Sequence, residues 1–308
     1  MKNMRTVYIY LILFIGVLAL STSAIFVKLS SAPAPIVATY RMMFSTILLL
    51  PALLFNKDIT HELINLSKKQ LLLGTISGAF LAFHYVLWFE SLHYTSMASS
   101  TIFVTLQPLF SFAGGYFFFK ERLKRFAIGG GILAIVGSFI IGLADFNIGG
   151  PALFGDILAL IAAGAITIYF LIGQELRKVL SLIPYVLIAY SSSTLFLLVY
   201  SLTLGYSLTG YPSSDWLCFL GLAFVSTILG QTIFNWLIKW MNASTISMSI
   251  LGEPVGTCIL AYFIFGNVIT VKQFVGSLII LFGIFLFLKY NKPVEKEQLT
   301  SDFENQMQ

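Results

Sequence analysis

The chain has 308 residues, of which 58% are hydrophobic and only 10% are charged, and its mean hydropathy is +0.91. A soluble domain carries about a quarter charged residues to cover its surface, so this composition excludes a soluble globular protein. It predicts an all-α integral membrane protein. The formal net charge of +5 does not imply a nucleic-acid partner, and we expect none, because the position of the basic residues along the chain matters more here than their number.

Ten segments are apolar and long enough to cross a bilayer, which takes roughly 20 residues of α-helix. They fill nearly the whole chain and leave no room for an extramembrane catalytic domain. The predicted spans are residues 7–27, 35–55, 71–91, 96–119, 125–143, 152–174, 183–204, 215–238, 243–265 and 270–289. The remaining residues, 291–308, are polar and predict a disordered cytoplasmic tail.

The first span resembles a signal peptide, since Lys2 and Arg5 precede an apolar run that ends in small residues. The run extends over about 20 residues, however, and a signal-peptide core has only about 7–15. We therefore expect a helix that is retained in the membrane.

The second span contains Arg41, about six residues from its predicted outer end and therefore roughly 9 Å deep. We favour a side chain that extends outward to the membrane surface, because arginine has a long apolar stem. The alternative is a role in a gate or in binding the carboxylate of a solute, which a planar guanidinium fits well.

The sequence contains two copies of one design. A shift of 146 residues places 83–143 on 229–289 without a gap, and it matches prolines, glycines and aromatic residues. The matched pairs are Pro108 and Pro254, Gly130 and Gly276, Gly137 and Gly283, Tyr116 and Tyr262, Phe117 and Phe263, Phe119 and Phe265, and Phe139 and Phe285. We predict five-helix repeats over 1–146 and 147–290, the second inverted because five is odd. Such repeats build alternating-access transporters.

The basic residues predict the orientation, because cytoplasmic loops of membrane proteins are rich in Lys and Arg. With the N-terminus inside, only Lys28 and Lys272 lie in external loops. The basic residues that then lie on the cytoplasmic side are Lys2, Arg5, Lys57, Lys68, Lys69, Lys120, Arg122, Lys124, Arg125, Arg177, Lys178, Lys239, Lys289, Lys292 and Lys296. We predict a multi-pass protein of the plasma membrane with both termini in the cytoplasm.

Stretches in both copies carry a resemblance to a known family. The first copy has Leu92-His-Tyr-Thr-Ser-Met-Ala98, then Pro108, and closes with Lys120-Glu-Arg122. The second copy has Asn242-Ala-Ser-Thr245 and Gly252-Glu-Pro254, but Asn267 stands where the family usually has Glu. The chain resembles the EamA family of the drug/metabolite transporter superfamily. The resemblance implies ten helices and the movement of small organic solutes, often amino acids or their metabolites, usually outward.

The two matched prolines indicate where a solute site could form. Pro108 leaves the carbonyl of Val104 without its helical donor, and Pro254 does the same to Ile250. Gln107 and Glu253 directly precede these prolines near the middle of their spans. Freed carbonyls are tolerated at this depth where they line a cavity or find another partner. We expect helix breaks beside a cavity. The alternative is that the prolines only shape helix packing and that Glu253 hydrogen-bonds a neighbour.

Polar residues recur at helical spacing on four spans, which predicts that these spans together line the cavity. The stripes are His84, Trp88 and Ser91; Ser100, Gln107, Ser111 and Gly114; Thr227, Gln231 and Asn235; and Ser249, Glu253 and Thr257. From them we predict a substrate site, with hydrogen bonds between helices as the alternative. Its residues are His84, Trp88, Gln107, Gln231, Asn235 and Glu253.

Glu253 and His84 are also candidates for proton coupling. A carboxyl group in a poorly hydrated site favours its neutral form, and an imidazole changes charge near neutral pH. Either group could bind a proton on one side of the membrane and release it on the other. Alternatively, Glu253 stays charged and binds the amino group of a solute.

These observations together predict a secondary transporter for small organic solutes, with a passive channel or facilitator as the alternative. An enzyme is not expected, since the three histidines, His61, His84 and His93, form no H-E-x-x-H motif. We expect no metal site and no cofactor. Cys218 and Cys258 lie in apolar segments and predict no disulfide framework.

Overall fold

The computed structural model describes residues 2–142 and 150–291, and every regular element within them is a helix. Ten segments in these ranges are long and apolar enough to span a membrane, which confirms the predicted number of spans. The predicted boundary between residues 146 and 147 lies outside the described residues, and so does the predicted tail after Asn291.

The first half runs from α1 to α8. Its helices are α1 (Lys2–Leu29), α2 (Ala34–Leu49), α3 (Pro51–Phe55), α4 (Lys57–Ile64), α5 (Lys68–Tyr94), α6 (Met97–Thr105), α7 (Gln107–Phe119) and α8 (Arg125–Gly142). The second span consists of α2 and α3, and the fourth consists of α6 and α7.

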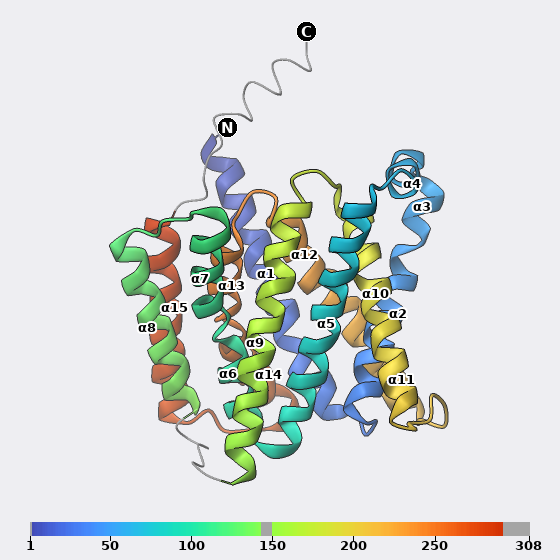
Figure 1. Cartoon of the computed structure of the whole chain (residues 1–308). Coiled ribbons are helices and arrows are strands. Elements are labelled where there is room, and N and C mark those ends of the chain that lie inside the picture. The colour runs from blue at the N-terminus through green and yellow to red at the C-terminus, as the bar shows by residue number, and fades with distance from the viewer. Residues whose placement is uncertain (1, 143–149, 292–308) are drawn as a thin grey trace.

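The second half has the same order of spans along the chain but the inverted orientation in the bundle: α1 and α9, the first spans of the two halves, run in opposite directions (Figure 1). Its helices are α9 (Pro151–Leu176), α10 (Leu182–Thr203), α11 (Ser213–Gly221), η1 (Leu222–Gln231), α12 (Thr232–Leu237), α13 (Ala243–Ile250), α14 (Glu253–Phe265) and α15 (Val271–Tyr290). The eighth span comprises α11, η1 and α12, and the ninth comprises α13 and α14.

The matched glycines pack against each other across the two halves. A Cβ on Gly130 would lie 2.7 Å from the carbonyl oxygen of Gly283, and one on Gly137 would lie 2.8 Å from that of Gly276. Gly130 therefore meets the repeat equivalent of Gly137, and Gly137 meets the equivalent of Gly130. This reciprocal pairing is what a two-fold relation requires, and the missing side chains let the backbones of α8 and α15 approach closely.

Both prolines lie at helix breaks, as the sequence predicts. α6 ends at Thr105 and α7 begins at Gln107, while α13 ends at Ile250 and α14 begins at Glu253. The two broken spans are neighbours: α7 contacts α13, and α6 contacts α14 (Figure 1). Residues at equivalent positions cap the N-terminal ends of both broken spans. Ser96 Oγ accepts from the Ser99 amide at 3.1 Å, and Asn242 Oδ1 accepts from the Thr245 amide at 3.0 Å.

The eighth span contains a long π-helical stretch, η1, in place of the regular α-helix that the sequence predicts. Its wider turns are visible in side-chain bonds, since the Thr227 hydroxyl donates to the carbonyl of Leu222 and the Thr232 hydroxyl donates to that of Thr227, each five residues back. π-Helical turns inside α-helices occur frequently at functional sites. This one ends at Gln231.

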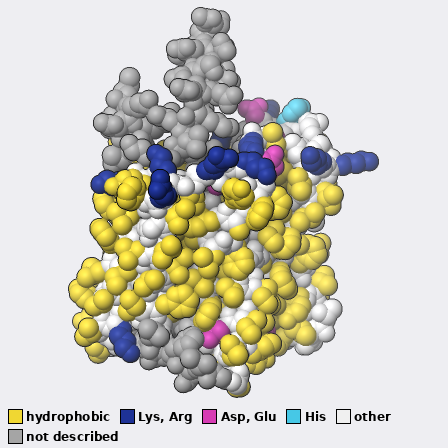
Figure 2. Space-filling view, turned by 60° about the vertical axis from the view of Figure 1, so that its left-hand side comes forward, with side chains coloured by type: hydrophobic (Ala, Val, Ile, Leu, Met, Phe, Trp, Pro, Cys, Tyr) yellow, Lys and Arg dark blue, Asp and Glu magenta, His cyan; other side chains and the backbone are white. Residues whose placement is uncertain are grey.

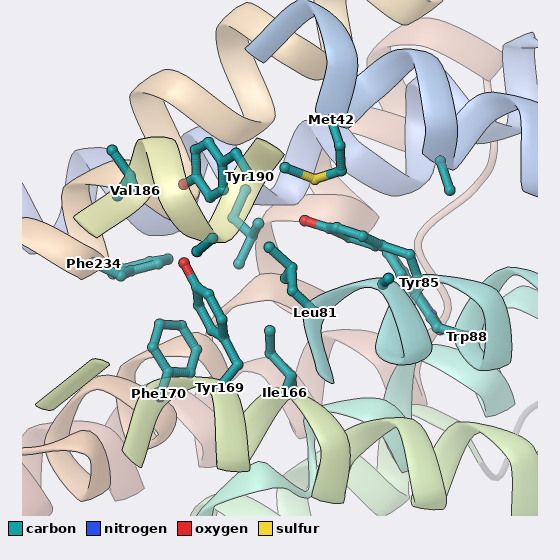
Figure 3. Close-up of a cluster of buried hydrophobic side chains, with 14 of the residues drawn as sticks. Met42, Leu81, Tyr85, Trp88, Ile166, Tyr169, Phe170, Val186, Tyr190 and Phe234 are labelled. Atoms are coloured by element: carbon teal, nitrogen blue, oxygen red, sulfur yellow. The ribbon is translucent and has the colours of Figure 1, made fainter. Parts of the chain in front are cut away.

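The largest core draws most of its residues from α2, α5, α9 and α10, extends to α1, α12 and α13, and is rich in aromatic residues (Figure 3). Tyr85, Trp88, Tyr169 and Phe170 are all buried in it. On the face shown in Figure 2 the surface is apolar over the middle of the bundle, with lysines and arginines gathered in a belt near one end. We call this end the basic end; α1 begins and α15 ends there (Figure 1).

Adjacent glycines of α8 test the close approach of the two halves. We expect Gly130→Val to lower the free energy of unfolding by about 1–3 kcal/mol, because the added side chain meets the backbone of α15. Gly129→Val is the matched control, since a Cβ there has no atom within 4 Å. Thermal unfolding in detergent measures both variants. Equal melting temperatures would contradict the packing described for these helices.

Candidate functional site

A small cavity lies where the two halves meet. Its volume is about 20 Å³, enough for one water molecule. Residues from both halves line it: Leu20, Arg41, His84, Tyr85, Trp88, Val104, Gln107, Ile166, Phe170, Gln231, Ile250 and Glu253. Several of them, including Tyr85, Trp88, Ile166 and Phe170, come directly from the aromatic core (Figure 3).

The cavity adjoins both helix breaks. Gln107 is the first residue of α7, Glu253 is the first residue of α14, and both side chains line the cavity. Val104 and Ile250, whose carbonyls the prolines deprive of a helical donor, line it as well. The irregular backbone of both spans therefore lies beside a cavity instead of facing lipid, which is the condition under which it is tolerated.

Three buried polar atoms of cavity-lining residues have no hydrogen-bond partner among the described residues: Trp88 Nε1, Gln107 Oε1 and Gln231 Nε2. An unsatisfied buried polar group costs about 1–3 kcal/mol, so native structures contain few of them. Three such atoms around one cavity leave hydrogen-bonding capacity that no described protein group fills, which makes the cavity a candidate site for a bound molecule.

Glu253 places a carboxyl group in the same cavity. Its side chain is 5% exposed and, among the described residues, has no ion pair within 4 Å and no hydrogen bond, although its backbone carbonyl accepts from Ser21 Oγ at 3.2 Å. A buried carboxyl group without a protein partner is costly in its charged form. The Glu253 carboxylate is therefore stabilised only when it binds a cation, a hydrogen-bond donor or a proton.

Arg41 lies inside the bundle, and the expectation that its side chain extends to the membrane surface is wrong. It is 1% exposed. Its Nε donates to Thr227 Oγ1 at 2.9 Å and its Nη1 donates to Ser23 Oγ at 2.6 Å. The guanidinium also lies 4.5 Å from the centre of the Tyr85 ring. Two hydroxyl acceptors and a cation–π contact stabilise the buried position. Arg41 is one of the residues that line the cavity.

His84 is oriented by the backbone of α9. Its Nδ1 lies 3.0 Å from the carbonyl oxygen of Ala162, and because a carbonyl only accepts, Nδ1 carries the proton. In the neutral ring Nε2 is then an acceptor. The imidazole stacks on Trp88 with ring centres 5.9 Å apart, so both side chains have fixed orientations at the cavity wall.

Comparison with known proteins agrees with this architecture. The model of the EamA-like transporter family matches residues 7–143 and 153–289, which together are most of the chain. The chain belongs to the EamA-like transporter family. It is therefore a multi-pass membrane transporter and not an enzyme, and the two matched stretches correspond to its two halves.

Curated relatives of this EamA-like protein are also transporters. The uncharacterised transporter YdfC of Bacillus subtilis is 24% identical over 214 residues, covering 68% of this chain and 69% of YdfC. The uncharacterised transporter YyaM of the same organism is 25% identical over 257 residues, covering 80% of this chain and 82% of YyaM. The riboflavin transporter ImpX of Fusobacterium nucleatum is 22% identical over 260 residues, covering 79% of this chain and 85% of ImpX.

A protein of known crystal structure shares the fold of this EamA-like transporter. The TM-score is 0.77, and the superposition covers 92% of this chain and 98% of the other. The sequence identity is 16%, so this comparison concerns the fold alone.

Each predicted polar stripe of this EamA-like transporter is divided between the cavity and helix packing. Ser91 and Ser100 hydrogen-bond each other at 2.5 Å, and Ser111 bonds Ser247 at 2.6 Å. The Thr257 hydroxyl donates to the carbonyl of Ser21 at 3.2 Å. Hydrogen bonding between helices, the alternative interpretation, therefore describes these residues. Those that line the cavity are His84, Trp88, Gln107, Gln231 and Glu253.

Asn235 does not line the cavity. It lies one helical turn past Gln231, where its Nδ2 donates to Tyr169 Oη at 2.5 Å and to Tyr190 Oη at 3.2 Å. The spacing placed Asn235 on the same stripe as Gln231, but at its level α9 and α10 present tyrosines. Sequence reasoning missed this tyrosine cluster, because buried tyrosines in an apolar span do not differ in pattern from packing aromatics.

Tyr85, Ile166 and Phe170 are further lining residues that the sequence analysis did not identify. Tyr85 is the immediate neighbour of His84, and the other two belong to the sixth span, which has no polar stripe. No sequence pattern distinguishes these side chains from the rest of the apolar core. Only the packing of α9 against α5 brings them to the cavity.

Two glutamines distinguish a ligand-binding polar group from a structural one. We expect Gln107→Leu to leave the melting temperature unchanged or to raise it, because the substitution removes an unpartnered buried oxygen. Gln174→Leu, the matched control, should cost about 1–3 kcal/mol. Gln174 donates to Glu121 Oε1 at 2.9 Å and accepts from the Ala243 amide at 2.5 Å.

Thermal unfolding without added solute measures both glutamine variants. If Gln107→Leu proved as destabilising as Gln174→Leu, Gln107 would have a structural partner, and the indication of a bound molecule would be weakened.

Proposed function

We propose that this EamA-like protein is a secondary transporter that binds a small polar organic solute at the cavity and moves it by alternating access. Amino acids and related metabolites are the proposed solutes, and drugs with a cationic group fit the same chemistry. The observation that carries the proposal is the set of unpartnered polar atoms, together with Glu253 and Arg41, in one cavity between the two halves.

The chemistry of the cavity suits a zwitterion. The Glu253 carboxylate would receive the amino group of the solute. Arg41 uses Nε and one terminal nitrogen for Thr227 and Ser23, so its other terminal nitrogen would bind the solute carboxylate. Trp88 and Phe170 would pack against the apolar part of the solute. A few fixed polar groups in an aromatic pocket are typical of small-molecule sites.

The size of the cavity supports a moving transporter rather than an open pore. Room for about one water molecule is too little for any organic solute, so the surrounding helices must separate to admit one. The broken spans α6–α7 and α13–α14 are the natural elements to move, because backbone at a break bends more easily than a continuous helix. The name of the relative ImpX, a riboflavin transporter, supports an organic solute.

Glu253 is the proposed site of proton coupling, with His84 beside the same cavity. When the cavity opens to one side, water would reach the carboxylate and allow it to exchange a proton. Transport would then combine the binding of a proton with that of the solute, or exchange one for the other. A solute amino group and a proton would satisfy the same carboxylate, which makes their competition a natural form of coupling.

The proposed location is the plasma membrane, with both termini in the cytoplasm. The belt of lysines and arginines at the basic end supports this orientation (Figure 2). The proposed direction is outward, in line with the family resemblance.

Solute counterflow in proteoliposomes tests the transporter directly. Vesicles are preloaded with a mixture of amino acids and related metabolites, and the uptake of each labelled compound is measured. We expect saturable exchange of one or a few compounds. Glu253→Gln should reduce this exchange at least about tenfold, because one charge-assisted hydrogen bond is worth roughly that factor, and it should flatten the dependence on pH.

Glu175→Gln is the control for the counterflow experiment, since the Glu175 carboxylate pairs with Lys178 at the surface, 2.5 Å away. Flux without saturation or exchange would favour the alternative, a passive channel or facilitator. If Glu253→Gln kept both the rate and the pH dependence of the wild type, Glu253 would have no part in binding or coupling.

Labelling of single cysteines tests the orientation. In a background of Cys218→Ala and Cys258→Ala, an impermeant maleimide on intact cells should modify the thiol introduced by Ser207→Cys and not that introduced by Lys178→Cys. Both side chains are exposed, at opposite ends of α10. The reverse pattern would place the termini outside.

A further inference from the structure

Glu121 connects the two halves at the basic end. It belongs to the loop after α7, in the first half, yet its carboxylate accepts three hydrogen bonds from the second half. Gln174 Nε2 donates to Oε1 at 2.9 Å, while Asn242 Nδ2 and Ser244 Oγ each donate to Oε2 at 2.9 Å. The carboxylate thus connects the ends of α7, α9 and α13.

The backbone around Glu121 is shaped for this contact. Lys120 has a φ of 56°, a left-handed conformation that turns the chain back at the end of α7, and the Glu121 amide then donates to the carbonyl of Gly115 at 3.0 Å. A Cβ on Gly115 would lie 2.5 Å from Glu121 Oε2. The absence of a side chain at Gly115 therefore makes the space that the carboxylate occupies.

The equivalent turn at the opposite end has no such contact. Gly266, the repeat equivalent of Lys120, has a φ of 67°, and the Asn267 amide donates to the carbonyl of Ala261 at 3.4 Å. The backbone is thus repeated, but the Asn267 side chain is exposed and makes no hydrogen bond within the described residues.

Another type of contact between the halves, a serine bonded to a carboxylate, occurs once at each end of the bundle. At the basic end Glu62 accepts from the amide and hydroxyl of Ser181. At the opposite end Asp215 accepts from the amide and hydroxyl of Ser31, at 2.9 and 2.8 Å. Each joins a carboxylate to a serine near the start of the second helical span of a repeat. At the opposite end the described residues add one further carboxylate contact between the halves, from Ser99 Oγ to Asp156 Oδ1 at 2.7 Å. The Glu121 carboxylate accepts three such bonds, so the difference favours closure of the basic end over closure of the opposite end.

We propose that Glu121 is a latch that holds the basic end closed and so biases the carrier toward the state in which the cavity is shut off from the cytoplasm. This inference rests on the proposed transport function. Opening toward the cytoplasm requires α7 to separate from α9 and α13, and the three hydrogen bonds of the carboxylate must then break. A conformational bias of this kind is a difference in the free energy of the two states.

Ser247 offers a position for a reporter of opening. It is fully buried and hydrogen-bonds Ser111 of α7, about one helical turn inward from Ser244. In the Cys218→Ala, Cys258→Ala background, inside-out vesicles that carry Ser247→Cys are treated with an impermeant maleimide, which reacts with the introduced thiol only when the basic end opens. The rate of modification then reports how often the basic end opens.

Glu121→Ala should raise this rate at least about tenfold, because the loss of even one hydrogen bond to a charged group is worth roughly that factor. Glu121→Gln should give an intermediate rate, since it keeps the shape of the side chain but turns one acceptor oxygen into a donor. Glu175→Ala is the matched control and should leave the rate unchanged, because Glu175 pairs with Lys178, just past the end of α9, and not with another element. Equal rates for Glu121→Ala and Glu175→Ala would overturn the latch.

A second reporter separates opening from loosened packing. Ser193 is fully buried, and its backbone lies against Gly78 of α5, away from the latch, so Ser193→Cys places the second thiol there. If Glu121→Ala also exposed that thiol, the substitution would have disrupted the fold, and the latch would be rejected. The labelling experiment needs no solute. If Glu121→Ala raised the labelling rate but the wild type showed no counterflow, only the transport proposal would be rejected. Intact counterflow with unchanged labelling would reject only the latch.

Discussion

The structure depends on one constraint, that backbone polar groups inside a membrane find their partners within the protein. Continuous helices meet it by themselves, but the spans broken before Pro108 and Pro254 do not. Both breaks therefore lie in the interior, where α6–α7 and α13–α14 are neighbours, and the carbonyl-bearing residues Val104 and Ile250 line a cavity there. The same prolines that weaken the two helices thereby fix where the protein has polar space.

The two halves share a frame, and the site arises where they differ. The glycine contacts between α8 and α15 are reciprocal, and the broken spans begin with equivalent caps. At equivalent positions beside the breaks, however, one half has the neutral Gln107 and the other has the acidic Glu253. The turn that carries Glu121 in one half carries Asn267 in the other. Under the proposed alternating access, a symmetric frame with unequal side chains would give two related states of unequal stability.

The polar groups of the cavity do not satisfy one another's hydrogen bonds among the described residues, which supports the proposed site. Arg41 is held by two hydroxyls and a tyrosine ring, whereas Glu253 has no partner for its carboxylate among the described residues. A structural ion pair would bring the two charges within contact distance. Here they remain apart in one cavity, with unpartnered amide and indole atoms beside them. This arrangement leaves binding capacity unused in the protein alone.

The sequence by itself determined the ten spans, the inversion of the second half, the two helix breaks and five of the six cavity residues proposed from spacing. These follow from hydropathy, an odd number of spans and the geometry of proline. Only the tertiary structure decided the direction of Arg41, the exclusion of Asn235 and the contribution of α9. The depth of a side chain follows from its sequence position, but its direction depends on neighbouring helices, and the π-helical stretch changes the phase along the eighth span.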